Sequence, residues 1–494
     1  MISLPEPDTR TLARRREIAA ALARIVPDGV AADDATLRAF DSDALSAYRQ
    51  TPLVCVLPRT ADQVSEILAF AAREGVRIVP RGAGTSLSGG ALPLADGILL
   101  TLTRMNRILE VDLENRCVVA EPGVTNLGVT KAVAHAGFYY APDPSSQIAC
   151  TIGGNVAENS GGIHCLKYGL TTHNLLGVEL ALLSGERVRL GGKSGDCGLD
   201  LLGVVAGSEG LLGVVTEATL RIIARAPAIR TLLLSFASVP DAGRAVAAII
   251  GAGIVPAAIE FMDRRCVDAV EAYCAPGYPK DAEAILIVEV DGLEREVEEA
   301  VTRIGAIARG AGATSIAASA DEKDRARFWS GRKAAFPAMG RLQPDMLCMD
   351  GTIPRKALAD VLERMTAMAE EYKLGFCNVF HAGDGNLHPL IIFDVMKPGE
   401  LERAEEFGAE ILKLCVSVGG VLSGEHGIGV EKKALMGEMF SEIDLAQQER
   451  LKCAFDSGGL LNPGKVFPML HACVELGHMH VRGGRLAFAN LPRM

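Results

Sequence analysis

The sequence lacks several features that mark large classes of proteins. No run of about 18 apolar residues occurs in its 494 residues, so no membrane span is expected. Its twelve cysteines include no CxxC pair, so an iron–sulfur cluster is not expected, and reduced thiols in a cytoplasmic protein are the simplest interpretation. The net charge of −11 argues against nucleic acid as a partner. An anionic substrate stays compatible with this charge if cations are concentrated inside a site.

The chain is long and rich in glycine. A chain of 494 residues exceeds the size at which one hydrophobic core stops growing, so two or three domains are expected. Many of the 53 glycines cluster between Arg81 and Gly213. Such clustering indicates a backbone that must approach another group closely.

The first half of the chain alternates the signals of strands and helices. Thr60 begins a helix, and Gln63 completes a capping-box pattern. Another helix runs from about Thr125 to a glycine C-cap at Gly137. The predicted strands are 53–57, 76–79, 98–102 and 117–120, followed by a hairpin of strands 176–183 and 187–190.

The pattern changes near residues 224–229, where strand, helix and strand signals begin to repeat. Strands are predicted at 232–236, 258–261 and 285–290, with helices after Asp241 and from Glu294. This order is typical of an antiparallel sheet with helices on one face, and the fold class is therefore α+β. We expect one domain over residues 1–225, to which residues 455–494 return, and a cap domain over residues 226–454.

Three Gly-rich segments predict a site for a large polar ligand. The segment 80–90 follows a strand and offers many backbone N–H groups, which can form an anion-binding nest for a diphosphate. It is not a GxGxxG motif that opens a helix, and a tight structural turn is the alternative. Segments 143–162 and 208–213 are also rich in Gly, Asn and Ser, and wrapping a cofactor explains such long irregular stretches economically.

These segments resemble the FAD-binding domain of the vanillyl-alcohol oxidase and p-cresol methylhydroxylase family. The matching stretches include Tyr140–Gln147, His164–Gly169 and Asp350–Pro354, and the resemblance extends over nearly the whole chain. It implies FAD as the cofactor. Because residues 81–90 contain no histidine that could tether the flavin, non-covalent FAD is expected. The expected FAD-binding residues are Pro80, Arg81, Gly82, Ala83, Gly84, Thr85, Ser86, Gly89, Gly90, Pro142, Asp143, Ser145, Ser146, Thr151, Gly153, Gly154, Asn155, Ala157, Asn159, Gly161, Gly162, Tyr168, Gly169, Glu209, Gly210, Gly213, Val215 and Asn462.

Two histidines flank a Gly-Asp-Gly-Asn turn in the second half. Strand signals on both sides place His381 and His388 on a tight hairpin, where two imidazoles can converge on one ion. Two unrelated histidines near a turn are the alternative. Asp384 is a less convincing ligand, since a carboxylate in such a turn more often bonds its own backbone.

Glu425 and His426 stand side by side between glycines. Neighbouring side chains of an extended segment point in opposite directions, so Glu425 could complete a metal site while His426 faces a substrate. A loop with a solvated Glu–His pair is the alternative. The family resemblance implies that His381, His388 and Glu425 bind a divalent metal and that His426 is the catalytic base. This ligand set suits Zn, Mn or Fe.

Arg332 resembles the arginine that binds the substrate carboxylate in relatives, although an exposed helix arginine would look the same locally. A bidentate guanidinium fits that role better than Lys333. Relatives that oxidise dicarboxylates carry a second cation, which aligns roughly with Cys348. The substitution favours a short monocarboxylate such as glycolate or D-lactate.

The expected reaction is oxidation of a 2-hydroxy acid to the 2-oxo acid, with hydride transfer to flavin N5. The resemblance implies partners, namely a second flavin-domain subunit and an iron–sulfur subunit at the inner face of a membrane. Alternatives are a D-lactate or broad D-2-hydroxy acid dehydrogenase that acts alone, a non-catalytic electron-transfer subunit, and a metallohydrolase. His471, His478 and His480 are interpreted as surface residues, and Cys150 and Cys165 as buried small side chains.

Overall fold

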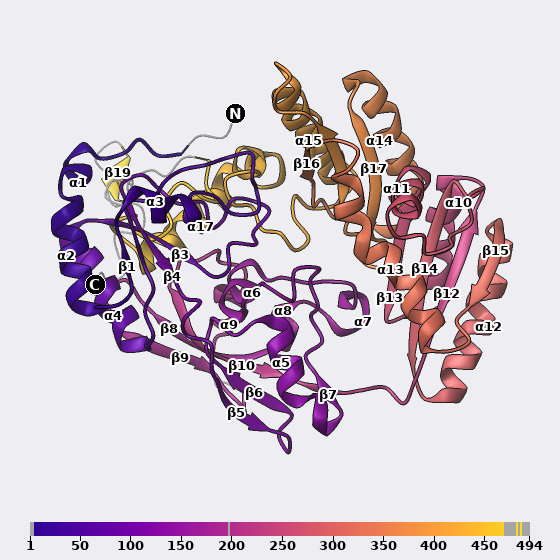
Figure 1. Ribbon diagram of the computed structural model, residues 1–494, viewed down its shortest axis with the longest axis horizontal. Helices are drawn as coiled ribbons and strands as arrows, with labels where there is room; N and C mark the ends of the chain where they lie inside the picture. Colours follow the sequence, from indigo (N-terminus) through magenta and orange to yellow (C-terminus); the bar gives the residue numbers. More distant parts are fainter. Residues whose placement is uncertain (1–3, 196–197, 469–480, 483–484, 487–494) are drawn as a thin grey trace.

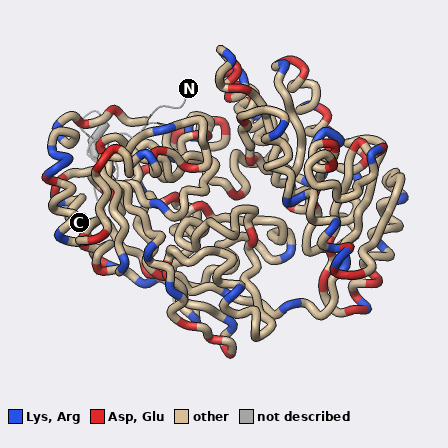
Figure 2. Tube along the Cα trace, in the orientation of Figure 1, with Lys and Arg blue, Asp and Glu red and all other residues tan. Residues whose placement is uncertain are grey.

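The computed structural model describes residues 4–195, 198–468, 481–482 and 485–486. Its strands fall into two groups on opposite sides of the molecule (Figure 1). The predicted surface histidines His471, His478 and His480 lie outside the described residues. Lys, Arg, Asp and Glu residues are interspersed along both halves (Figure 2), in keeping with the moderate net charge.

The first group holds a four-stranded and a five-stranded sheet. The first has the order β1-β2-β4-β3, with β2, β4 and β3 parallel, and consists of β1 (Val30–Ala31), β2 (Val54–Val56), β3 (Arg77–Arg81) and β4 (Gly97–Thr101). The second is antiparallel with the order β5-β6-β10-β8-β9, and consists of β5 (Ile108–Asp112), β6 (Cys117–Ala120), β8 (Leu175–Ala181), β9 (Arg187–Gly191) and β10 (Val214–Arg221). The predicted strands and hairpin of this half are confirmed.

Helices cover these sheets where the sequence places apolar faces. In α4 (Ala61–Glu74), Val64, Ile67 and Leu68 pack into one core with α2 (Arg15–Ile25) and both sheets. Thr60 caps α4 by accepting a hydrogen bond from Gln63 N, as predicted. The Gln63 side chain, however, accepts from Arg59 N instead of completing a capping box at Thr60. The second sheet packs on α5 (Asn126–Val133) and α6 (Ile152–Glu158).

The second group is one antiparallel sheet with the order β15-β12-β14-β13-β17-β18-β16. Its strands are β12 (Ala228–Phe236), β13 (Ala258–Asp263), β14 (Ala284–Gly292), β15 (Ala313–Ala318), β16 (Asp345–Cys348), β17 (Gly375–His381) and β18 (Pro389–Phe393). The prediction of helices on one face is wrong, because helices cover both. One face carries α10 (Val239–Gly251), α12 (Glu294–Gly310), α14 (Leu358–Tyr372) and α15 (Glu400–Ser417), and the other carries α11 (Arg264–Cys274) and α13 (Glu322–Met339). The continuous apolar run of β14, buried on both sides, is the physical reason.

The chain returns to the first group after α17 (Glu442–Phe455). Leu461 pairs with Ile78 of β3, and Asn462 N donates a hydrogen bond to Ile78 O. The yellow segment therefore lies beside the indigo part of the chain (Figure 1). The remaining elements are short: α1 (Thr9–Ala13), α3 (Asp34–Leu37), α7 (Cys165–Tyr168), α8 (Thr171–Asn174), α9 (Leu202–Val205), α16 (Met436–Met439), β7 (Phe138–Tyr139), β11 (Ile223–Ala224), β19 (Val481–Arg482), β20 (Arg485–Leu486) and the 3-10 turns at 38–40, 134–136, 355–357 and 433–435.

Two features bear on the expectations about membranes and thiols. None of the helices in the described part of the chain has both the length and the apolar character that a membrane-spanning helix needs. Nine cysteines of the described residues are free thiols, and Cys453 takes part in a disulfide bond, which the expectation of reduced thiols did not include. Cys150 is buried as expected, and Cys165 is half-buried.

Candidate active site

One cavity of about 410 Å³ lies between the two halves and is lined by both. The strands and loops of the first half contribute most of the predicted FAD-binding residues: Pro80, Arg81, Gly82, Ala83, Gly84, Thr85, Ser86, Gly90, Ser145, Ser146, Thr151, Gly153, Gly154, Asn155, Ala157, Glu209, Gly210, Gly213 and Val215. The second half contributes Arg332, Phe336, His381, His388, Glu425 and His426. All the predicted catalytic and metal-ligating side chains thus face the same space as the Gly-rich loops.

The two longest Gly-rich loops approach each other so closely that only small residues fit. A Cβ on Gly82 would lie 2.3 Å from Thr151 Oγ1, and a Cβ on Gly90 would lie 2.6 Å from Glu158 Oε1. Side chains at these positions would displace Thr151 and Glu158 or force the loops apart. The glycines therefore bring two stretches of main chain together along one wall of the cavity.

Unpaired polar atoms on this wall fit a polar cofactor. Thr151 Oγ1 and Glu158 Oε2 are buried without a hydrogen-bond partner among the described residues. Burial, together with neighbouring Glu209, raises the pKa of the Glu158 carboxyl well above its usual value, so this group is a neutral donor at the cavity. Buried polar atoms without partners are rare, and a bound ligand such as FAD would satisfy them.

The remaining predicted FAD-binding residues do not line the cavity: Gly89, Pro142, Asp143, Asn159, Gly161, Gly162, Tyr168, Gly169 and Asn462. Several of them hold the lining segments in place. Asn462 Nδ2 donates hydrogen bonds to Gly90 O and Glu209 O, which joins two of the Gly-rich loops. Asp143 accepts from His164 N, and Tyr168 donates its hydroxyl proton to Asp291 in the second half.

His381 and His388 converge on one carboxylate oxygen. The predicted hairpin is present, because β17 ends at His381 and β18 begins directly after His388. His381 Nε2 lies 3.1 Å and His388 Nε2 lies 2.9 Å from Glu425 Oε1. Asp384 accepts a hydrogen bond from Asn386 N within the turn, as expected of a residue that bonds its own backbone.

The charges of this group suit a divalent cation. Burial alone would lower the pKa of both imidazoles, but the pKa of His381 is raised well above its usual value, chiefly by Glu260, and the pKa of His388 is raised to about 9. Burial would raise the pKa of Glu425, yet the two histidines hold that pKa well below its usual value. A cation that replaces the imidazole protons would meet three ligand atoms that all lie within 4.8 Å of one another, and two nitrogens and one oxygen are ligands that Zn²⁺ accepts.

The Glu425–His426 loop is held by Asp350, a fully buried residue that sequence reasoning did not select. Its carboxylate accepts hydrogen bonds from Glu425 N, His426 N and Lys432 Nζ at 3.1, 2.9 and 3.0 Å. Asp350 belongs to a stretch that resembles the family, but no local pattern shows that it contacts a loop some 75 residues later. Glu209 also holds this loop, because its carboxylate accepts hydrogen bonds from Ile428 N and Gly429 N.

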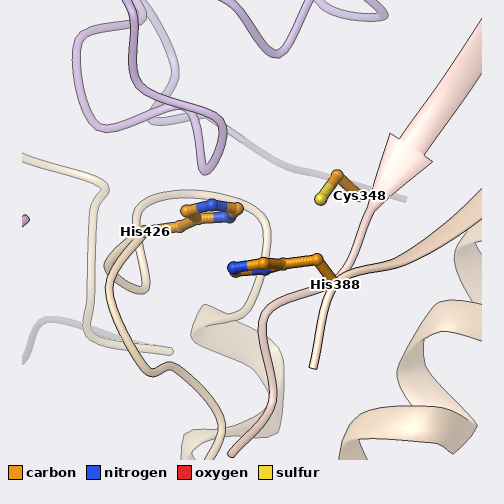
Figure 3. A group of neighbouring side chains, drawn as sticks. All are labelled: Cys348, His388 and His426. Atoms are coloured by element: carbon orange, nitrogen blue, oxygen red, sulfur yellow. The ribbon is translucent and has the colours of Figure 1, made fainter. Parts of the chain in front are cut away.

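His426 stacks on His388 at a centroid separation of 4.9 Å, with the rings nearly parallel (Figure 3). Glu425 and His426 therefore meet the same histidine, one at its edge and one at its face. Burial lowers the pKa of His426 to about 4, and its Nδ1 is buried without a hydrogen-bond partner among the described residues. The imidazole is thus neutral at pH 7. Cys348 lies beside both rings (Figure 3).

Arg332 lies inside the protein, so the alternative of an exposed helix arginine is wrong. It projects from α13 into the cavity lining, is 3% exposed, and donates a hydrogen bond from Nε to Glu260 Oε2 at 2.7 Å. Glu260 also escaped the sequence reasoning. Its signal would have been a charged residue in the middle of the otherwise apolar segment 258–262 of β13.

Comparisons with known proteins match both halves. Residues 52–191 match a model of an FAD binding domain, and residues 225–466 match the C-terminal domain of FAD linked oxidases. The glycolate oxidase subunit GlcD of Escherichia coli K12 is 54% identical over 92% of this chain and 91% of its own length. A D-lactate dehydrogenase of Archaeoglobus fulgidus is 35% identical over 84% of this chain and 91% of its own.

Solved structures agree on the fold. 4-Ethylphenol oxidase from Gulosibacter chungangensis aligns with a TM-score of 0.79 at 18% identity, covering 94% of this chain and 99% of its own. p-Cresol methylhydroxylase with substrate bound aligns equally well at 15% identity, over 94% of this chain and 98% of its own. The fold expected from the sequence motifs is confirmed.

Proposed function

The chain belongs to the family of FAD-linked oxidases and is an FAD-dependent 2-hydroxy acid oxidoreductase, and we propose that it oxidises a short monocarboxylate, glycolate or D-lactate, with the help of a divalent metal. The observation that carries the proposal is the shared cavity, where the Gly-rich loops and Arg332, His381, His388, Glu425 and His426 face the same space. We also propose that residues 1–225 with the returning C-terminal segment bind FAD, and that residues 226–454 form the substrate cap.

The position of a side chain supports each proposed role. FAD would supply a two-electron acceptor, and a divalent ion held by His381, His388 and Glu425 would act as a Lewis acid that eases loss of the substrate's hydroxyl proton. His426, neutral near pH 7, accepts that proton at a ring nitrogen. Arg332 binds the substrate carboxylate through its guanidinium.

The distribution of positive charge supports a monocarboxylate. Among the described residues that line the cavity, the permanent cations are Arg332 and Arg81, and Arg81 belongs to the flavin-facing loop. Beside His388 and His426 stands the uncharged thiol of Cys348. A second carboxylate placed there would lose its hydration without gaining a partner, which is costly in a buried site.

Anaerobic reduction of the bound flavin by a panel of 2-hydroxy acids tests the substrate. We expect glycolate or D-lactate to bleach the flavin, and L-lactate and 2-hydroxy dicarboxylates to do so far more slowly. Faster bleaching by a dicarboxylate would overturn the argument from Cys348. Bleaching by none of the acids would favour an electron-transfer subunit without its own catalysis.

Non-covalent attachment of FAD is supported by the cavity-lining loop 81–90, which contains no histidine. Acid denaturation of the purified protein should release the flavin into the supernatant. Flavin that stays with the precipitated chain would show a covalent link.

We propose that partner subunits reoxidise the flavin, namely a second flavin-domain subunit and an iron–sulfur subunit. The support is that the relative with 54% identity is named as a subunit of glycolate oxidase. Any attachment to the inner membrane would then come from the partners. The isolated chain should reduce an artificial dye far faster than it consumes oxygen. Rapid stoichiometric peroxide production, or full activity with quinone by the chain alone, would favour a self-sufficient enzyme.

A further inference from the structure

A carboxylate joins the predicted metal ligand to the predicted substrate arginine. Glu260 lies on β13, is fully buried, and belongs to neither set of predicted site residues. Its Oε1 lies 2.7 Å from His381 Nδ1, and its Oε2 lies 2.7 Å from Arg332 Nε. Through His381 Nε2 the chain of contacts continues to Glu425 Oε1. One side chain therefore touches two groups that act on different ends of a 2-hydroxy acid.

Contacts on both sides fix the Glu260 carboxyl group in place. It forms a buried ion pair with Arg332 and a hydrogen bond with His381. The backbone of β13 also fixes it, because Glu260 pairs with His381 across the β13–β17 ladder. The carboxyl group is thus held between two partners.

We propose that Glu260 is a positioning residue that holds the metal ligand His381 and the substrate-binding Arg332 at a fixed separation. This inference rests on the proposed function. By accepting the Nδ1–H of His381, it leaves the lone pair at Nε2 available to a metal ion. By accepting the Nε–H of Arg332, it leaves the two Nη groups for the substrate carboxylate, which must then bind end-on. The distance between hydroxyl site and carboxylate site is thereby set by one residue.

A second buried glutamate offers a matched control. Glu289 on the neighbouring strand β14 is 1% exposed and accepts hydrogen bonds from Arg325, Trp329 and Thr231. It therefore resembles Glu260 in burial and in its arginine partner. Glu289 does not line the cavity and contacts none of the proposed ligands among the described residues. Its substitution reports what the loss of a buried ion pair does to the protein in general.

The test compares Glu260→Gln with Glu289→Gln in the FAD-loaded protein. Zn²⁺ affinity is measured by competition with a chromophoric chelator, without turnover, and KM and kcat are measured separately. We expect Glu260→Gln to weaken Zn²⁺ binding about 10–100-fold, as loss of such outer partners does, and to raise KM. Glu289→Gln should keep Zn²⁺ affinity within twofold of wild type, because all three proposed ligands lie in the second half, and both variants should retain FAD.

Each outcome decides something. Zn²⁺ affinity and KM that stay at the wild-type values in Glu260→Gln overturn the inference and leave the proposed function intact. A wild-type chain that binds no metal overturns the proposed metal site and the inference with it. If Glu260→Gln does not fold, Glu260→Asp keeps the charge but is shorter by one methylene, so it cannot reach both donors. Unchanged Zn²⁺ affinity and unchanged KM in that variant would also overturn the inference.

Discussion

The two walls of the cavity are built from different kinds of groups. The wall from the first half consists mostly of main chain and small residues, and its glycines let loops 80–90 and 151–160 approach within contact distance. The opposite wall consists mostly of charged and imidazole side chains, of which Arg332, His381 and His388 are buried and paired with a carboxylate. The first wall suits recognition of a large cofactor by shape and backbone, and the second suits proton transfer and metal binding.

This difference predicts that substitutions on the two walls impair different properties of the protein. A change on the side-chain wall should alter metal content or rate while FAD stays bound. A change on the main-chain wall should weaken FAD binding while the metal ligands keep their geometry. Asp350 and Glu209 matter to both, since each holds the loop that carries Glu425 and His426. The predictions below test whether the two kinds of failure separate.

The largest effect is expected for His388→Ala. It removes one of three ligands and leaves Glu425 with a single imidazole partner. We expect loss of the bound metal and a fall in turnover of about 10³-fold, which corresponds to about 4 kcal/mol of lost transition-state stabilisation. Metal analysis and FAD absorbance on the same sample check that the metal is lost and that FAD is retained. Wild-type metal content in the variant would remove His388 from the site, and loss of FAD would show that the walls do not act separately.

A smaller loss of rate is expected for His426→Ala. Removing a general base lowers flavin reduction at saturating substrate by about 10²–10⁴-fold. Stopped-flow reduction with the preferred acid measures this limit. Arg332→Ala is the contrast, because loss of a carboxylate contact should change apparent substrate affinity more than maximal rate. If both variants only raised the substrate requirement at an unchanged maximal rate, His426 would not be the base.

On the main-chain wall, Gly82→Ala should weaken FAD binding. The new Cβ would lie 2.3 Å from Thr151 Oγ1, so the Thr151 side chain must shift or the two loops must separate. Overpacking of this kind costs about 1–3 kcal/mol, which corresponds to about 5–150-fold in affinity. Gly251→Ala at the end of α10 is the control, since a Cβ there meets nothing within 4 Å. Equal FAD dissociation constants for the two variants would contradict the close-approach argument, whereas Zn²⁺ affinity should be unchanged in both.

The contrast between the walls also explains how much could be predicted from sequence. The main-chain wall is formed by contiguous sequence motifs such as residues 80–90, which can be recognised directly. The strand signals on both sides of the turn correctly predicted that His381 and His388 lie on one hairpin. Glu260 and Asp350 were missed because their role depends on partners 72 to 121 residues away in sequence. Helices on both faces of the second sheet were missed because periodicity shows that a strand is buried but not what covers it.

The smallest effect concerns the polar contacts that hold the two halves together, where His164 lies between Asp143 of the first half and Glu289 of the second. His164 Nδ1 is 2.8 Å from Asp143 Oδ2, and Nε2 is 3.4 Å from Glu289 Oε1, which also binds Arg325. Burial alone would lower the pKa of His164, but the two carboxylates raise that pKa well above its usual value of 6.5. The protonated ring therefore bridges the halves at neutral pH.

A raised pKa fixes the direction of the pH dependence. The stabilisation by His164 is fully present below about pH 6.5 and is lost as the pH rises through the higher pKa of the folded state. At pH 6, His164→Gln should lower the free energy of unfolding by about 1.5–3 kcal/mol, the range for hydrogen bonds to charged groups. The deficit should shrink at alkaline pH. A double-mutant cycle with Asp143→Asn checks the cause, because its coupling energy should fall over the same pH range. A deficit that is constant with pH would mean that His164 joins the halves as a neutral ring.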